Sequence, residues 1–156
     1  MTPLLVLRAG LLGVVAGLRS QLPTAALAAR DVEPPSGPLA LLASGGGRRA
    51  AYLAAVGEIV ADKLPVTPSR MDRGPLIGRV VSGGVAGAVL ASAAGVRGAR
   101  MVLPIAAGAA GAYLGSWAGS TARAAVGRAT GWPDPAVAVG EDLVAVGLAA
   151  LAVRGA

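Results

Sequence analysis

The nine residues AGLLGVVAG at positions 9–17 have a second copy, AGAAGAYLG, at positions 107–115, in which every glycine is kept. Both copies lie in apolar runs, and glycines four residues apart share one face of a helix. Small residues on such a face let two helices approach closely in a membrane, although glycine is also common there in general. We predict that these two helices pack together through Gly13, Gly17, Gly111, Gly115 and Gly119.

The composition is typical of a membrane protein. Of 156 residues, 54% are hydrophobic and only 14% are charged, whereas a soluble domain carries about 25% charged residues. A soluble alanine-rich bundle is the alternative, but glycine within a helix costs about 1 kcal/mol in water, and the chain has 24 glycines. It contains no cysteine and no histidine, which excludes disulfides, thiol nucleophiles and the usual zinc sites. We predict no cofactor and no metal site.

Five segments approach the roughly 20 apolar residues that a bilayer-spanning helix needs. They cover residues 4–22 (or 4–29, past an interruption at Arg19, Ser20, Gln21 and Pro23), 50–66, 76–96, 101–126 and 136–153. We therefore predict an all-α membrane protein with about five transmembrane helices, forming one domain over residues 1–156 in the bacterial cytoplasmic membrane. A cleaved signal peptide is the alternative for the first segment, but the basic start that such a peptide requires is missing.

A longer repeat extends the glycine match. AVGEIVA at 55–61 matches AVGEDLVA at 138–145, so residues 4–66 resemble residues 101–154, with a central helix at 74–96 between them. Two helix pairs separated by a single crossing have opposite orientations, which is the inverted-topology repeat of many transporters. The alternative is chance similarity in a chain rich in alanine and glycine.

The repeated motif places one acid in each copy, Glu58 and Glu141. A charged side chain at the centre of a bilayer costs about 3 kcal/mol, so it usually faces inward and is paired. We expect Arg79 and Arg123 to be the partners of these acids, on one side of the membrane. The candidate residues for binding a substrate or ion are Glu58, Glu141, Arg79, Arg123, Asp62 and Asp142. Salt bridges that only fix the register of the helices are the alternative, especially for Asp62 and Asp142.

Four stretches resemble a known family: GLRSQLP at 17–23, GEIVADKLPVTPSR at 57–70, GRVVSGGVAGAVL at 78–90 and PDPAVAVGEDLVAVGLAA at 133–150. The most specific pattern is E-x-x-A-D-K-x-P, which begins at Glu58. The chain resembles the DUF4126 family, small bacterial integral-membrane proteins of unknown function. The resemblance covers nearly the whole chain and implies a multi-pass membrane protein, but it implies no activity.

These features favour a small transporter- or channel-like protein with a polar site inside the membrane. A non-catalytic membrane scaffold or accessory subunit is the main alternative. We expect no enzyme, because the chain lacks the nucleophile-elbow, phosphate-loop and dinucleotide motifs. A metal-assisted enzyme acting on lipid headgroups, with the ion at Glu58 and Asp62, is a third alternative.

The expected partners follow from charge and size. The basic residues lie between the apolar runs and are suited to lipid headgroups, and the near absence of aromatic stacking residues argues against a nucleic-acid partner. Five thin helices enclose little volume, so we expect a homo-oligomer, in particular a dimer. The loop between the second and third segments has the densest basic cluster, which predicts the N-terminus inside and, after five crossings, the C-terminus outside.

Overall fold

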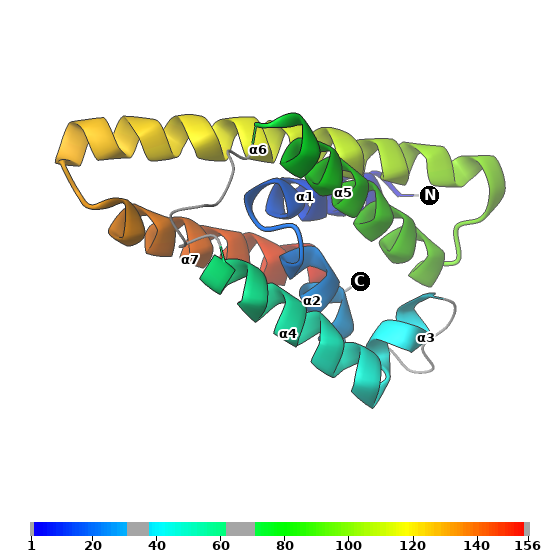
Figure 1. Cartoon of the computed structure of the whole chain (residues 1–156). Coiled ribbons are helices and arrows are strands. Elements are labelled where there is room, and N and C mark those ends of the chain that lie inside the picture. The colour runs from blue at the N-terminus through cyan, green and yellow to red at the C-terminus, as the bar shows by residue number, and fades with distance from the viewer. Residues whose placement is uncertain (1, 31–37, 62–70, 155–156) are drawn as a thin grey trace.

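The computed structural model describes residues 2–30, 38–61 and 71–154, and every secondary-structure element in these ranges is a helix (Figure 1). The predicted all-α class is confirmed. The elements are α1 (Pro3–Leu18), α2 (Leu22–Ala28), α3 (Pro38–Ala43), α4 (Gly45–Ala61), α5 (Arg73–Ala93), the 3-10 helix η1 (Gly98–Met101), α6 (Val102–Thr130) and α7 (Asp134–Val153). The five predicted segments correspond to α1, α4, α5, α6 and α7.

The first segment is broken into two helices. α1 ends at Leu18, and Arg19 has an extended backbone, with φ −144° and ψ 107°. Pro23 explains the break, because in a continuous helix its ring would clash with the carbonyl group of Arg19. In the first turn of a new helix proline is well tolerated, and Pro23 lies there in α2.

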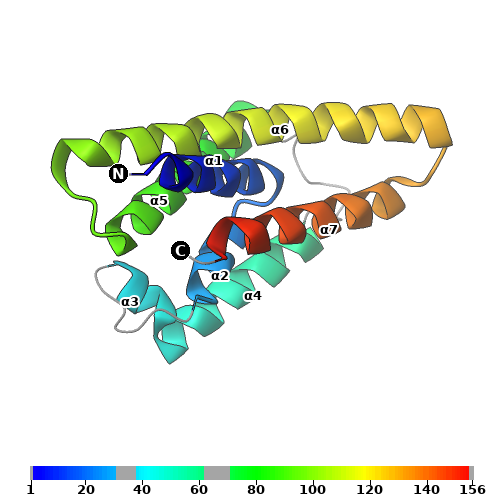
Figure 2. The same ribbon diagram turned by 180° about the vertical axis from the view of Figure 1, so that it is seen from behind.

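α2 turns the chain back, so α1 and α4 run in the same direction (Figures 1 and 2). α1 also runs parallel to α6, because Gly13 lies against Gly108 and Gly17 against Ala112 and Gly115. α5 and α7 run in the opposite direction. The chain between α1 and α4 therefore contains a return that five alternating crossings do not include.

This return overturns two predictions from the sequence. An inverted repeat of residues 4–66 and 101–154 requires α1 and α6 to be antiparallel, but they are parallel. The structure also disagrees with the predicted placement of the termini on opposite sides. Arg8 Nη2 donates a hydrogen bond of 2.6 Å to the carbonyl oxygen of Arg154, so the start of α1 lies beside the end of α7.

The core of the bundle is built from small residues on α1, α5 and α6, and α1 lies against α6 at four of the five glycines named from the sequence. A Cβ atom on Gly13 would lie 2.1 Å from the carbonyl oxygen of Gly108, and one on Gly111 would lie 2.2 Å from that of Gly10. Gly17 and Gly115 are as close to the opposite backbone. Gly119 is buried one turn further along α6.

The large aliphatic residues lie mainly on the outside. Among the exposed side chains are Leu53 on α4, Val81 on α5, Leu114 on α6 and Leu143 on α7. Three helical stretches, residues 73–93, 98–130 and 136–153, are long and apolar enough to cross a membrane, and α1 is a shorter apolar helix. Small residues inside and aliphatic residues outside suit a bundle surrounded by lipid.

Candidate functional site

The break between α1 and α2 is covered by a carboxylate from α4. Glu58 Oε1 accepts hydrogen bonds from the backbone N–H of Ser20 (2.7 Å) and from the Ser20 hydroxyl (2.6 Å). Glu58 Oε2 accepts a bond of 2.8 Å from the backbone N–H of Gln21. Arg79 of α5 lies 3.7 Å from Glu58 Oε1. One carboxylate thus satisfies the donors that the helix break exposes, and it is paired with a buried cation.

The backbone carbonyl groups of Gly17 and Ser20 at the break accept hydrogen bonds from side chains of α5 and α6. The Gly17 carbonyl oxygen accepts bonds from Arg79 Nη1 at 3.0 Å and from the hydroxyl of Ser116 on α6 at 3.2 Å. The Ser20 carbonyl oxygen accepts a bond of 2.5 Å from the hydroxyl of Ser82 on α5. Arg79 therefore links α1 to α4, because its guanidinium contacts both the Gly17 carbonyl oxygen and the Glu58 carboxylate.

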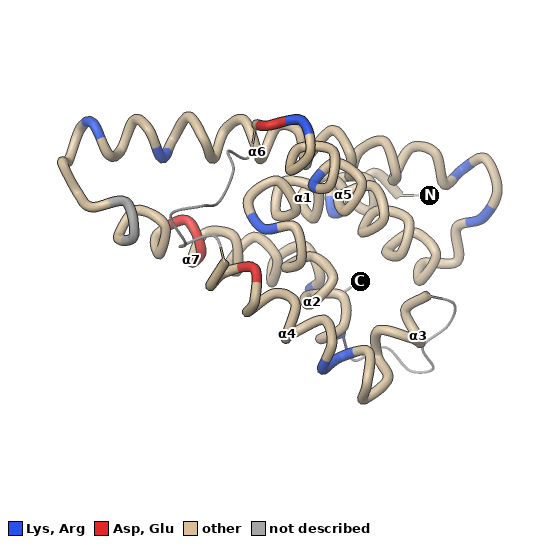
Figure 3. The backbone as a smooth tube through the Cα atoms, viewed as in Figure 1, with Lys and Arg blue, Asp and Glu red and all other residues tan. Residues whose placement is uncertain are grey.

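Two further ion pairs connect α7 to the same region. Figure 3 marks where the charged residues lie along the backbone. Arg19, which is only 1% exposed, donates from Nε to Asp142 Oδ1 at 2.5 Å. Arg123 Nη1 of α6 lies 3.9 Å from Glu141 Oε2. Arg19 adjoins Ser20, and Glu141 adjoins Asp142, so the three ion pairs form one connected polar region around the break.

A cavity of about 450 Å³ opens beside this region between α1, α6 and α7. Its walls are mainly apolar and include Val14, Gly119 and Val144, whereas Arg123 and Glu141 bring charge to the lining. A mostly apolar cavity with a few polar groups is typical of a site for a small ligand.

The polar region lies deep in the bundle rather than at its end. Ser116, which contacts the break, is the middle residue of α6, and its side chain is fully buried. The break therefore lies near half the length of α6. α6 is also long enough to cross a membrane. The break would thus be close to the centre of a bilayer crossed by α6.

The structure brings together five of the six candidate residues from the sequence. The expected partners are adjacent, since Arg79 lies beside Glu58 and Arg123 beside Glu141. Asp142 pairs with Arg19, which was not a candidate. Asp62 lies outside the described residues.

Sequence reasoning missed the contributions of Arg19, Ser20, Ser82 and Ser116. The stretch RSQ before Pro23 did carry a signal, because three consecutive polar residues ahead of a proline predict a break within an apolar run. Ser82 and Ser116 gave no signal, because a single serine in a transmembrane helix often bonds only within its own helix.

Long apolar helices around a charged helix break define an all-helical protein with the features of a membrane protein. The chain belongs to the family described as Domain of unknown function (DUF4126), whose profile matches residues 6–155. No curated protein and no solved structure matches the chain.

Proposed function

We propose that this chain is a multi-pass protein of the bacterial cytoplasmic membrane that moves a small solute or ion, with the α1–α2 break as its central site. α4, α5, α6 and α7 would cross the bilayer, whereas α1 would reach only as far as the break, and α2 would return the chain to the side from which α1 entered. The observation that carries the proposal is the carboxylate of Glu58 on a helix break halfway along α6. Helices interrupted near the middle of the membrane form the substrate and ion sites of many transporters.

The contacts of Glu58 suggest how such a site would change state. The ionised carboxylate holds α4 on the break through three hydrogen bonds and the nearby Arg79. Protonation of Glu58, or its replacement by another anion, would weaken these charge-assisted bonds and release α4. The donors of Ser20, Gln21 and Arg79 would then be available to a solute arriving through the cavity beside Glu141.

The substitution Glu58→Gln tests this role. The amide keeps the shape of the side chain but removes the charge, so we expect flux to change by about tenfold, the effect of one charged hydrogen bond. Flux is measured in proteoliposomes as proton uptake driven by an imposed potential, and as release of a trapped mixture of small ions and metabolites. Asp72→Asn is the matched control, because Asp72 is exposed and makes no side-chain capping bond at α5.

A membrane scaffold remains the second candidate, favoured by the observation that both Glu58 oxygens already bond to groups of the same chain. A scaffold predicts that Glu58→Gln lowers the melting temperature in detergent, while wild-type proteoliposomes show no more flux than empty ones. Flux in the wild type that equals flux in Glu58→Gln and in Asp72→Asn would also contradict the transport role of Glu58.

A further inference from the structure

The cavity of about 450 Å³ between α1, α6 and α7 follows the two long helices away from the helix break. α6 and α7 are antiparallel and are joined by a short turn (Figures 1 and 2). The α6 wall of the cavity reaches from Gly115, beside the break, to Val126, and residues of α7 form the opposite wall. Trp132, in the turn, completes the lining. The cavity is therefore a trough that runs from the break towards the α6–α7 turn.

The lining of the trough is small and apolar. Twelve of its fifteen described lining residues are glycine, alanine, valine or leucine. A Cβ atom on one of them, Gly140, would meet no neighbouring heavy atom within 4 Å beyond its own turn of helix. The two charged lining residues, Arg123 and Glu141, have opposite charges and lie 3.9 Å apart, from Nη1 to Oε2. Such a lining suits a hydrocarbon ligand better than an ion.

The length of the trough matches one leaflet of a bilayer. Val126 follows Gly115 by eleven residues on α6, which corresponds to about 17 Å of helix. Half of the hydrocarbon core of a bilayer is about 15 Å thick. The trough also has exposed walls, because Val144 is 57% exposed and Trp132 is 60% exposed. With the break near the centre of the bilayer, the trough would face the hydrocarbon of one leaflet.

The end of the trough at the α6–α7 turn has the residues expected at a headgroup region. Trp132 lines it there, and tryptophan is enriched where a membrane meets water. Arg128 lies in the last turn of α6, two residues after Val126, and is exposed. A positive charge at this level complements the phosphate of a lipid headgroup.

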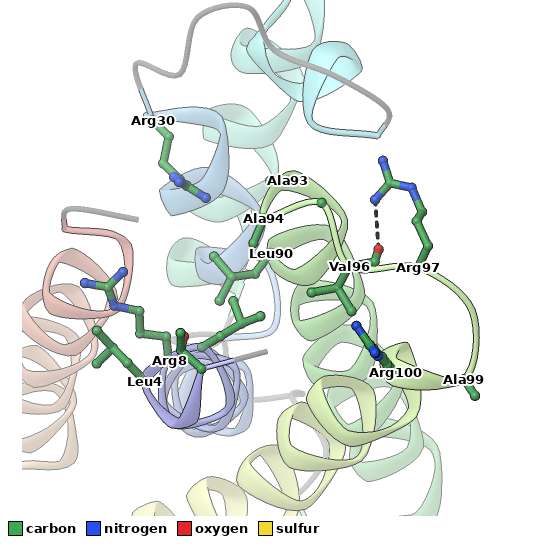
Figure 4. Close-up of a pocket in the computed structure, with 13 residues that line it drawn as sticks. Leu4, Arg8, Arg30, Leu90, Ala93, Ala94, Val96, Arg97, Ala99 and Arg100 are labelled. Atoms are coloured by element: carbon green, nitrogen blue, oxygen red, sulfur yellow. Dashed lines mark hydrogen bonds between the residues drawn. The ribbon is translucent and has the colours of Figure 1, made fainter.

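The trough is confined to this half of the bundle. A cavity of about 800 Å³ at the other end of α1 has a different lining, which includes Arg8, Arg30, Arg97 and Arg100 (Figure 4). It shares no lining residue with the trough. The apolar path therefore ends near the break, as the end of a hydrocarbon chain would.

We propose that the trough binds one hydrocarbon chain of a membrane phospholipid, with the phosphate group of that lipid near Arg128. The proposal rests on the membrane position proposed above and not on transport. A solute that reaches the break through this cavity would have to displace the chain.

Retention and position of the lipid are measured on the full chain in nanodiscs of phosphatidylethanolamine and phosphatidylglycerol. After extraction into a delipidating detergent, native mass spectrometry gives the phospholipid that remains bound, and we expect one molecule per chain. A phospholipid with a photoreactive diazirine near the end of its chain shows where that end lies. We expect its crosslinks near Leu18 and Leu148 at the break end of the trough, rather than at the exposed Val81 and Val85 of α5.

Gly140→Leu fills the trough. We expect it to lower the retained phospholipid by at least about fivefold, because the leucine occupies space that the chain needs. Gly147→Leu is the matched control on the same helix, since a Cβ atom there also meets no neighbour within 4 Å and Gly147 does not line the trough. Ala122→Leu fills the trough from the α6 wall and serves if Gly140→Leu fails to fold.

Three results would overturn the proposal. They are a wild type that retains no phospholipid, equal retention in Gly140→Leu and Gly147→Leu, and crosslinks confined to the outer face of α5. Loss of a dimer in Gly140→Leu, with no phospholipid retained by the wild type, would show that a helix of a second copy fills the trough instead. Phospholipid retention without flux contradicts only the transport proposal, and flux without retention contradicts only the lipid in the trough.

Discussion

Gly13→Ala is expected to prevent the close packing of α1 on α6 and to leave little folded protein in detergent. The added Cβ atom would lie 2.1 Å from the carbonyl oxygen of Gly108. That atom belongs to the backbone and cannot turn away like a side chain, so the two helices must separate. Overpacking costs about 1–3 kcal/mol where side chains can adjust, and we expect the upper end of this range or more. The measurement is the free energy of unfolding in a denaturing detergent titration.

Gly10→Ala is the matched control on the same helix. A Cβ atom on Gly10 would have the Ala107 carbonyl oxygen at 3.8 Å as its nearest neighbour across the interface, an ordinary van der Waals distance. Both variants make the same change in helix propensity. Equal stability of Gly10→Ala and Gly13→Ala would contradict the packing of α1 described here.

Asp142→Ala is expected to have the second large effect, because it leaves the Arg19 guanidinium without this carboxylate. Arg19 is 1% exposed, and its Nε lies 2.5 Å from Asp142 Oδ1. Breaking a buried ion pair by removing one partner costs about 3–5 kcal/mol, since the other charge stays buried. The free energy of unfolding is again measured in a denaturing detergent titration.

The double variant Arg19→Met/Asp142→Ala separates the effect of the buried charge from the loss of packing. Without the guanidinium, no charge is left in the interior at this position. We expect the double variant to be more stable than Asp142→Ala alone, because a hydrophobic replacement of a whole buried ion pair is often neutral or better. Equal instability of the double and single variants would show that Arg19 is not stabilised mainly by Asp142.

The sequence predicted the helices well but not their directions. Apolar length and glycine spacing are local properties, and they identified the five long helices and the contact of Gly13 and Gly17 with α6. Direction depends on how often the chain turns. A single polar interruption ahead of Pro23 introduces one more turn, and this turn reverses the relation between the two glycine copies.

The candidate site was predictable in part for the same reason. Glu58 and Glu141 were identified because a charge in an apolar run requires a partner, and the arginines nearest in depth proved to be adjacent. The role of Ser20 could not be predicted, because it uses a backbone N–H group that is exposed only where α1 stops. The pairing of Arg19 with Asp142 depends on the same break, which places Arg19 outside the helix.

The most direct test of the account is to determine on which sides of the membrane three positions lie. The chain has no cysteine, so single cysteines at Thr2, Arg154 and Trp132, all exposed positions, are labelled with a membrane-impermeant maleimide in intact cells and in inverted vesicles. Because α2 returns the chain between α1 and α4, we expect the cysteines at 2 and 154 to be labelled from one side and the cysteine at 132 from the other. Labelling of positions 2 and 154 from opposite sides would contradict the helix break, the return through α2 and the site built on them.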